Sequence, residues 1–130
     1  MKVLFVCRHN RFRSKVAEAI FKKNNKNKKF KVRSRATFPD YIPVAENVQK
    51  VLEEKGVKRI NKYPKKLRKE DVEWADLIVV VANEVDRSFK NKKTLNWKVS
   101  DTNQSDVEGI RKRTDIIERK VLQLLKAVKK

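Results

Sequence analysis

The stretch VLFVCRHNRFRSKVAEAIF, residues 3–21, joins a short apolar run, a basic loop and an amphipathic pattern. The run VLFV is far too short to cross a membrane and has about the length of one buried β-strand. After the loop, four apolar residues fall on one face of a helix: Val16, Ala17, Ile20 and Phe21. The stretch therefore predicts a strand, a tight loop and a helix in direct succession.

Three further segments predict strands. The run LIVVV at Leu77–Val81 is apolar throughout, as expected of a strand that is buried on both faces. Phe30–Ala36 alternates between apolar and polar residues, and Leu95–Val99 (LNWKV) is a weaker candidate.

Two further helices are predicted between and after these strands. One has Pro43 at its first helical position and Gly56 at its C-terminal cap, with an apolar face of Val44, Val48, Val51 and Leu52. The last begins at SDVE, where Ser105 and Glu108 have capping-box spacing. Its apolar face continues through Ile110, Ile117, Val121, Leu124 and Val128.

Strands that alternate with helices predict an α/β fold with a parallel sheet. For the 130 residues we expect a single three-layer domain, residues 1–130, with a four-stranded parallel sheet and helices on both faces. Ligands of such sheets bind beyond the carboxyl ends of the strands, and Cys7 follows the first predicted strand.

The chain is strongly basic, with 35 Lys and Arg against 16 Asp and Glu and a net charge of +19. Such a field attracts anions, including phosphorylated proteins, nucleotides, nucleic acid and acidic membranes. The run KKNNKNKKFK (Lys22 to Lys31) is interpreted as a solvated loop after a helix; nucleic acid is a possible partner but not the favoured one.

Cellular context follows from absences in the sequence. No stretch approaches the length of a transmembrane helix, and VLFV is too short for the apolar part of a secretory signal. One cysteine excludes an internal disulfide and an all-cysteine metal site, which suits a reducing compartment. We expect a cytoplasmic protein, monomeric and not bound to membranes.

The loop CRHNRFRS, Cys7 to Ser14, predicts a site for an anion. A helix N-terminus offers unpaired N–H groups, and Arg13 offers a planar fork for two phosphate oxygens. Cys7 would then be a thiolate nucleophile for phosphoryl transfer, with Ser14 as a donor to the sulfur. Asn10 is the loop residue best suited to a left-handed conformation. The alternative is an inert buried cysteine before a basic surface turn, and the position between a strand and a helix argues against it.

The segment FVCRHNRFRSKVAEAIF resembles the signature of the low-molecular-weight protein tyrosine phosphatases, C-x5-R-S followed by an Ala-Glu pair. The pattern NRxRS, at Asn10 to Ser14, is more similar still to a small branch of predicted tyrosine phosphatases. VRSRAT (Val32 to Thr37) resembles the family's second strand, and WADLIVVV (Trp74 to Val81) resembles its third.

This resemblance implies a hydrolase for a phosphorylated protein or a small phosphomonoester, with no metal and no cofactor. Cys7 would be the nucleophile, Arg13 the phosphate clamp, Ser14 the thiolate donor and Asn10 the loop stabiliser. Ser34 would be a hydrogen-bond partner of Asn10. The remaining phosphate-binding loop residues would be Arg8, His9, Arg11 and Phe12.

The resemblance also implies a general acid, an aspartate on the loop after the last strand. Asp101 is the chosen candidate, with an ordinary Asx turn as the alternative for it. Asp106 is explained by the start of the last helix, where acidic residues are favourable.

This chain departs from the family pattern at several positions. Asp101 is followed by Thr102 where the family has proline, Phe12 replaces a second cysteine, and Lys15 replaces another proline. Phe38 and Tyr41 are candidate aromatic walls of the site.

Two other activities remain open at this point. The first is an arsenate reductase, which would need an external thiol because no second cysteine exists. The second is a catalytically weak module that binds phosphate or nucleic acid on the same scaffold. Phosphocarrier domains also place a cysteine after a first strand, but they lack an arginine at the position of Arg13.

Overall fold

The computed structural model describes residues 1–84, 89 and 91–128. In these residues four strands form one parallel sheet in the order β2-β1-β3-β4. The strands are β1 (Lys2–Cys7), β2 (Lys31–Ala36), β3 (Leu77–Val80) and β4 (Lys93–Asn96). The predicted α/β class and four-stranded parallel sheet are confirmed.

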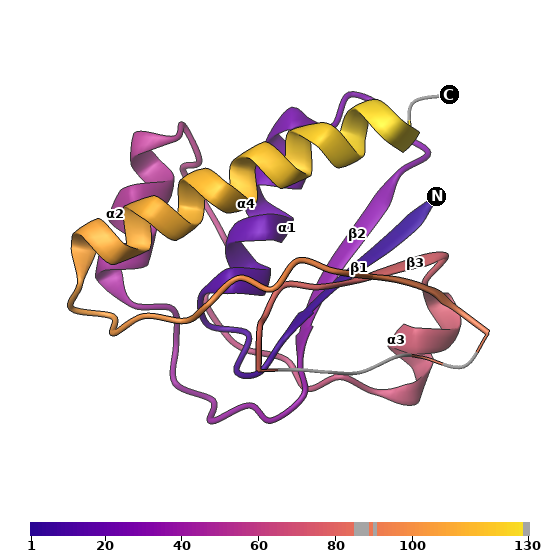
Figure 1. The fold of residues 1–130 in the computed structure, drawn as a ribbon, viewed down its shortest axis with the longest axis horizontal. Coiled ribbons are helices and arrows are strands. Elements are labelled where there is room, and N and C mark those ends of the chain that lie inside the picture. The colour runs from indigo at the N-terminus through magenta and orange to yellow at the C-terminus, as the bar shows by residue number, and fades with distance from the viewer. Residues whose placement is uncertain (85–88, 90, 129–130) are drawn as a thin grey trace.

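Helices cover both faces of the sheet, as predicted (Figure 1). The helices are α1 (Arg13–Asn24), α2 (Glu46–Glu54), α3 (Lys69–Trp74) and α4 (Val107–Val128). Helices α1 and α4 pack on each other over one face, α2 packs against α4, and α3 lies on the opposite face. Helix α3 has only six residues, and the sequence pattern did not predict it.

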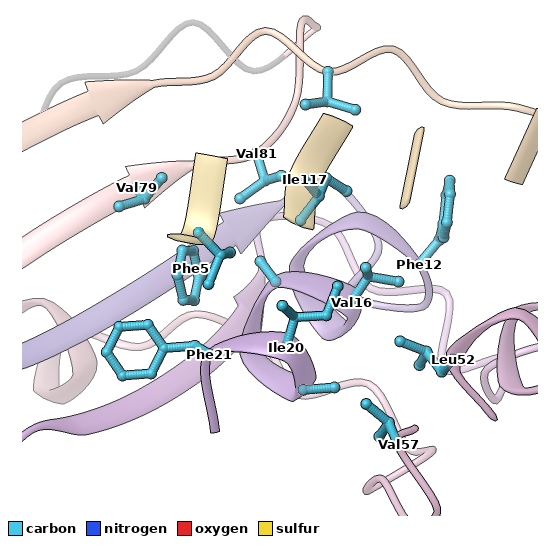
Figure 2. Close-up of a cluster of buried hydrophobic side chains, with 14 of the residues drawn as sticks. Phe5, Phe12, Val16, Ile20, Phe21, Leu52, Val57, Val79, Val81 and Ile117 are labelled. Carbon is cyan, nitrogen blue, oxygen red and sulfur yellow. The ribbon is translucent and has the colours of Figure 1, made fainter. Parts of the chain in front are cut away.

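Residues Val3–Val6 of the central strand β1 are all apolar because both faces of the strand are buried. Val3 and Phe5 join the core cluster of α1 and α4, where the Phe5 and Phe21 rings meet edge to face at 5.9 Å (Figure 2). Leu4 and Val6 face the other way and pack with residues around α3. All four strand residues are fully buried, so the strand has no polar face.

The fourth strand lies earlier in the chain than predicted, at Lys93–Asn96 instead of Leu95–Val99. The backbone leaves the sheet after Trp97, whose N–H still donates to the Val80 carbonyl, and Lys98 adopts a positive φ of 31°. Val99 is nevertheless buried in the core. The apolar side chain of Val99 therefore indicated a buried residue, but that residue does not belong to a strand.

Helix boundaries also differ from the prediction. Helix α2 begins at Glu46, three residues after Pro43, because Ala45 is still extended. Gly56 follows the helix with φ +84°, which confirms the predicted glycine at its C-terminal end. The predicted Ser105–Glu108 capping box is wrong, since the Asp106 carboxylate accepts the Gly109 N–H at 2.9 Å and caps α4.

Strand register brings four loops together at one edge of the sheet. Cys7 pairs with Ala36 on β2, Val6 pairs with Val80 on β3, and Val80 pairs with Asn96 on β4. The segments that follow these residues therefore converge beyond the carboxyl ends of the strands. In the described part of the chain, no helix combines the length and apolarity that crossing a membrane requires.

Candidate active site

The loop between β1 and α1 curls around the sulfur of Cys7. Asn10 is fully buried and has a φ of 55°, which confirms the left-handed conformation predicted for it. This conformation turns the Asn10 backbone N–H toward Cys7, where it donates to Sγ at 3.3 Å. The loop thus achieves its tight turn without a glycine.

The side-chain amide of Asn10 determines which way the Ser14 hydroxyl points. Its Oδ1 accepts the backbone N–H of Lys65 at 3.0 Å, so its NH₂ group must be the one that meets Ser14 Oγ at 2.7 Å. Ser14 Oγ accepts that bond, and Cys7 Sγ lies 3.0 Å from the same oxygen. With the Asn10 amide donating to its oxygen, the Ser14 hydroxyl can direct its own proton at the Cys7 sulfur.

The first turn of α1 is open toward an anion. Its N-cap residue, Phe12, makes no side-chain capping bond, and no acidic residue lies in the first turn. The N–H groups of this turn therefore keep their positive end available beside Cys7. The Phe12 side chain itself is only 2% exposed and packs into the core, so Phe12 contributes backbone alone to the loop (Figure 2).

Arg13 is buried and held by partners from distant parts of the chain. Its Nη1 donates to Glu84 Oε2 at 3.0 Å and to the Val99 carbonyl at 2.9 Å, and its Nη2 lies 2.7 Å from Glu84 Oε1. A buried guanidinium requires such a charged partner. Sequence reasoning missed Glu84, although its place just after β3, at the carboxyl edge of the sheet, was an available signal.

The structure brings Asp101 to the same site. Its Oδ2 lies 3.8 Å from Arg13 Nη2, and its Oδ1 accepts the N–H of Thr102 at 2.9 Å. Arg113 on α4 anchors this loop, because its Nε donates to the carbonyls of Ser100 at 2.9 Å and Asp101 at 3.1 Å. The Asp101 side chain remains 45% exposed, so water can reach its carboxylate.

Asp106 has a different environment from Asp101. One oxygen accepts the Gly109 N–H, and the other accepts the Thr102 hydroxyl at 3.0 Å. These two bonds, the Gly109 bond first, lower the pKa of Asp106 below its usual value. Asp106 therefore acts as the carboxylate cap of α4, as its position in the sequence suggested.

Residues 2–130 match the family described as low molecular weight phosphotyrosine protein phosphatase. The chain belongs to this family. Among curated proteins, none matches the sequence.

Solved structures agree with the family assignment. A low-molecular-weight protein tyrosine phosphatase from T. tengcongensis is 26% identical with a TM-score of 0.89, over 98% of this chain and 99% of that one. An arsenate reductase from Archaeoglobus fulgidus is 29% identical with a TM-score of 0.80, over 95% and 98%. A mutant of the YwlE arginine phosphatase with a phosphorylated active-site serine is 26% identical with a TM-score of 0.84, over 100% and 97%.

The rim of this low-molecular-weight phosphatase loop is basic and partly aromatic. Arg8 is exposed, and Arg11 Nη1 lies 3.4 Å from Asp40 Oδ2. His9 Nδ1 donates to the Phe38 carbonyl at 2.8 Å, since a carbonyl can only accept. The side chain of Phe38 is 71% exposed beside the rim, and that of Tyr41 is 62% exposed.

Ser34 does not have the partner predicted for it. Its hydroxyl donates to Glu18 Oε1 on α1 at 2.8 Å, whereas the Asn10 amide bonds Ser14 and Lys65. The buried face of β2 lies against α1, so Glu18 is the nearer neighbour. In this family member Ser34 supports the α1–β2 packing instead of the loop residue.

Lys15 is a buried cation in the first turn of α1, where the family pattern has proline. Its Nζ donates to the Tyr63 carbonyl at 2.9 Å, which ties α1 to the segment that carries Lys65. Burial is the main cause that lowers the pKa of Lys15 to about 8, and nearby Lys65 and Arg35 act in the same direction.

Metal ligands are sparse in this phosphatase fold. Residues 1–84, 89 and 91–128 contain no cluster of three or more His, Cys, Asp and Glu side chains that could hold a metal ion.

Proposed function

We propose that this protein hydrolyses phosphomonoesters through a phosphocysteine intermediate on Cys7. One observation carries the proposal: the Ser14 hydroxyl lies 3.0 Å from the Cys7 sulfur, with the Asn10 amide bonded to its oxygen, and Arg13 is the neighbouring residue on the same turn. An inert buried cysteine needs no oriented donor. A thiolate nucleophile, and later a thiolate leaving group, both need one.

In the first step the Cys7 thiolate attacks phosphorus, and the bond from phosphorus to the ester oxygen breaks. Arg13 and the N–H groups at the start of α1 stabilise the charge on the equatorial oxygens. The departing oxygen takes a proton from Asp101, so the leaving group is an alcohol or phenol and Asp101 becomes a carboxylate.

In the second step Asp101 accepts a proton from water, and the resulting hydroxide attacks the phosphocysteine. The sulfur–phosphorus bond breaks, inorganic phosphate forms, and the electrons return to Cys7 as a thiolate. The Ser14 proton stabilises that thiolate and makes it a better leaving group. The phosphorylated active-site serine described for the mutant arginine phosphatase is consistent with transfer to this loop position.

Protein phosphotyrosine is the proposed substrate. The exposed side chains of Phe38 and Tyr41 follow β2 at the same edge of the sheet as Cys7, and the Phe38 carbonyl is bound to His9 on the loop. Aromatic surfaces of this kind stack against a phenyl ring.

Arsenate reduction is the second candidate, because the Archaeoglobus fulgidus arsenate reductase is 29% identical to this chain. The sequence contains one cysteine, so a thiol from another molecule would have to resolve any arsenate adduct on Cys7.

The test measures phosphate release from p-nitrophenyl phosphate and from phosphotyrosine and phosphoarginine peptides, with Cys7→Ser as the matched control. We expect turnover of the aryl ester and of the phosphotyrosine peptide, and none with Cys7→Ser. A parallel assay supplies arsenate with glutathione or thioredoxin. Arsenite formation without phosphate release would overturn the proposal, and a preference for the phosphoarginine peptide would replace phosphotyrosine as the substrate.

A further inference from the structure

Two hollows adjoin along the edge strand β2 and share Arg33. The first, about 590 Å³, is lined by four basic and no acidic side chains: Lys2, Lys22, Lys31 and Arg33. The second, about 550 Å³, is lined by five basic side chains, Arg33, Arg35, Lys65, Lys66 and Arg68, and two acidic ones, Glu70 and Asp71. These basic residues together are called the β2 basic surface below.

The positive charge of this surface is only partly neutralised. A single carboxylate, Asp71, serves both Arg33 at 3.2 Å and Arg35 at 3.1 Å. In the described chain, the side chains of Lys31, Lys66 and Arg68 form no ion pair. The surplus of cations gives the surface a positive potential, which attracts polyanions.

Part of this surface is held in place before any partner binds. The Arg33 guanidinium lies 4.1 Å from the centre of the Trp74 ring while it pairs with Asp71. Arg35 is fixed by Asp71 and by the Ser34 carbonyl at 2.7 Å. Such prior ordering reduces the entropy lost on binding.

The β2 basic surface is connected to the active-site loop. Lys65, which lines the second hollow, donates its backbone N–H to the Asn10 side chain within the loop. Tyr41 lines the same hollow, and the neighbouring Asp40 pairs with Arg11 on the loop rim. A chain segment lying on this surface would therefore lead to the loop that holds Cys7.

The spacing of the cations matches an extended peptide. Lys31, Arg33 and Arg35 are alternate residues of one strand and lie on one face, about 6.6 Å apart. Alternate side chains of a peptide in extended conformation have the same spacing. Basic residues on an edge strand also prevent pairing with other sheets, but that purpose does not require the further cations at Lys65–Arg68.

We propose that the β2 basic surface binds an acidic, extended segment of the phosphorylated substrate protein, next to the residue that is dephosphorylated. This inference rests on the proposed function, because it names the substrate class of the same site. The surface would raise the rate of encounter and the affinity for acidic substrates, and it would not alter the chemical step.

The experiment compares two phosphopeptides that differ only in their flanking residues, Asp and Glu in one and Asn and Gln in the other. The test variant is K31E/K66E/R68E. The control variant, K112E/R119E/K126E, makes the same charge change on exposed residues of α4, on the opposite side of the sheet. We expect the test variant to lose about 10- to 100-fold in kcat/KM for the acidic peptide at low salt. Its kcat/KM for the neutral peptide and for p-nitrophenyl phosphate should change less than about twofold, and the control variant should keep its preference for the acidic peptide.

A binding measurement separates this inference from the proposed function. Fluorescence anisotropy with the Cys7→Ser protein and both peptides reports the preference for acidic flanks without turnover. Failure of every hydrolysis assay would overturn the proposed function, while the binding preference and its loss in K31E/K66E/R68E would still support the surface. Equal affinity for both peptides would overturn the inference. A different result would also overturn it: the protein does not discriminate between the peptides but binds a single-stranded oligonucleotide, and K31E/K66E/R68E loses that binding while the control variant keeps it.

Discussion

Arg13 and Glu84 form a bidentate ion pair beside the active-site loop, with nitrogen–oxygen distances of 3.0 and 2.7 Å. The pair engages both Nη atoms, and among the described residues no group accepts a hydrogen bond from the Nε of Arg13. Glu84 thus holds the side of the guanidinium that carries both Nη atoms, and the proposed function places a phosphate oxygen on the Nε side. The clamp depends on a residue far away in the sequence.

Replacing Glu84 with Gln should weaken this clamp. Without the carboxylate the buried guanidinium loses its closer charged partner and keeps Asp101 at 3.8 Å, and we expect kcat/KM to fall about 10- to 100-fold. The loss should be similar for p-nitrophenyl phosphate and for phosphotyrosine, since both substrates need the clamp. Glu53→Gln on the exposed side of α2 is the matched control and should be neutral. A loss confined to phosphotyrosine would instead place Glu84 in proton transfer.

Asp101→Asn tests the general acid. A p-nitrophenolate leaving group needs little protonation, whereas the tyrosyl oxygen needs much more, so the variant should lose about 10²–10⁴-fold on phosphotyrosine and far less on the activated ester. The alkaline limb of its rate profile should also disappear. Small and equal losses on both substrates would mean that this loop supplies no proton.

Asp106→Asn is the matched control for Asp101→Asn, and it should affect stability instead of rate. Because the folded-state pKa of Asp106 is lowered, its carboxylate stabilises the fold above the pKa that it has in the unfolded chain. The variant should therefore have a lower melting temperature at neutral pH. This difference should vanish as acid protonates the folded carboxylate, and the rate profile should stay unchanged.

Alkylation of Cys7 tests the thiolate. Iodoacetate should modify Cys7 at about pH 6, where an ordinary cysteine, ionising near about pH 8.5, reacts slowly. Inorganic phosphate should protect the residue, and Ser14→Ala should slow the reaction, because the donor at 3.0 Å is removed. Mass spectrometry after timed quenching gives the rates. Modification confined to pH values above about 8, without phosphate protection, would contradict the proposed nucleophile.

Lys15→Met tests the cost of the buried ammonium. The folded-state pKa of Lys15 is about 8, and its usual value is 10.5. Between these values the unfolded chain holds more protons, so wild-type stability should gain on the order of 2 kcal/mol as pH rises from 8 to 10.5. Lys15→Met should lack this rise, whereas Lys50→Met, which replaces an exposed lysine, should keep it. Urea unfolding across this pH range measures the difference; parallel curves for wild type and Lys15→Met would show that Lys15 is charged at no cost.

The part of the site formed by β1, the loop after it and the start of α1 depends on consecutive residues of the sequence. The apolar run of the first strand, a loop with Asn10 in the left-handed region and an amphipathic helix after it are local properties, so the sequence alone predicted them. The family resemblance of the same segment located Cys7, Arg13 and Ser14. Hydrogen bonds around the sulfur hold Ser14 beside Cys7.

The remainder depended on contacts between residues far apart in the chain. Glu84 and Val99 lie 71 and 86 positions from Arg13. The place of Glu84 just after β3 puts it at the right edge of the sheet, but only the fold shows that it pairs with this guanidinium. Ser34 bonds Glu18 instead of Asn10, because the way β2 packs on α1 decides which polar group is nearest. The β2 basic surface likewise forms only when residues 65–68 are brought beside strand residues 31–35. Periodicity and composition report the burial and conformation of a segment. The partner of a buried charge, and the lining of a hollow shared by several segments, depend on which segments the sheet brings together.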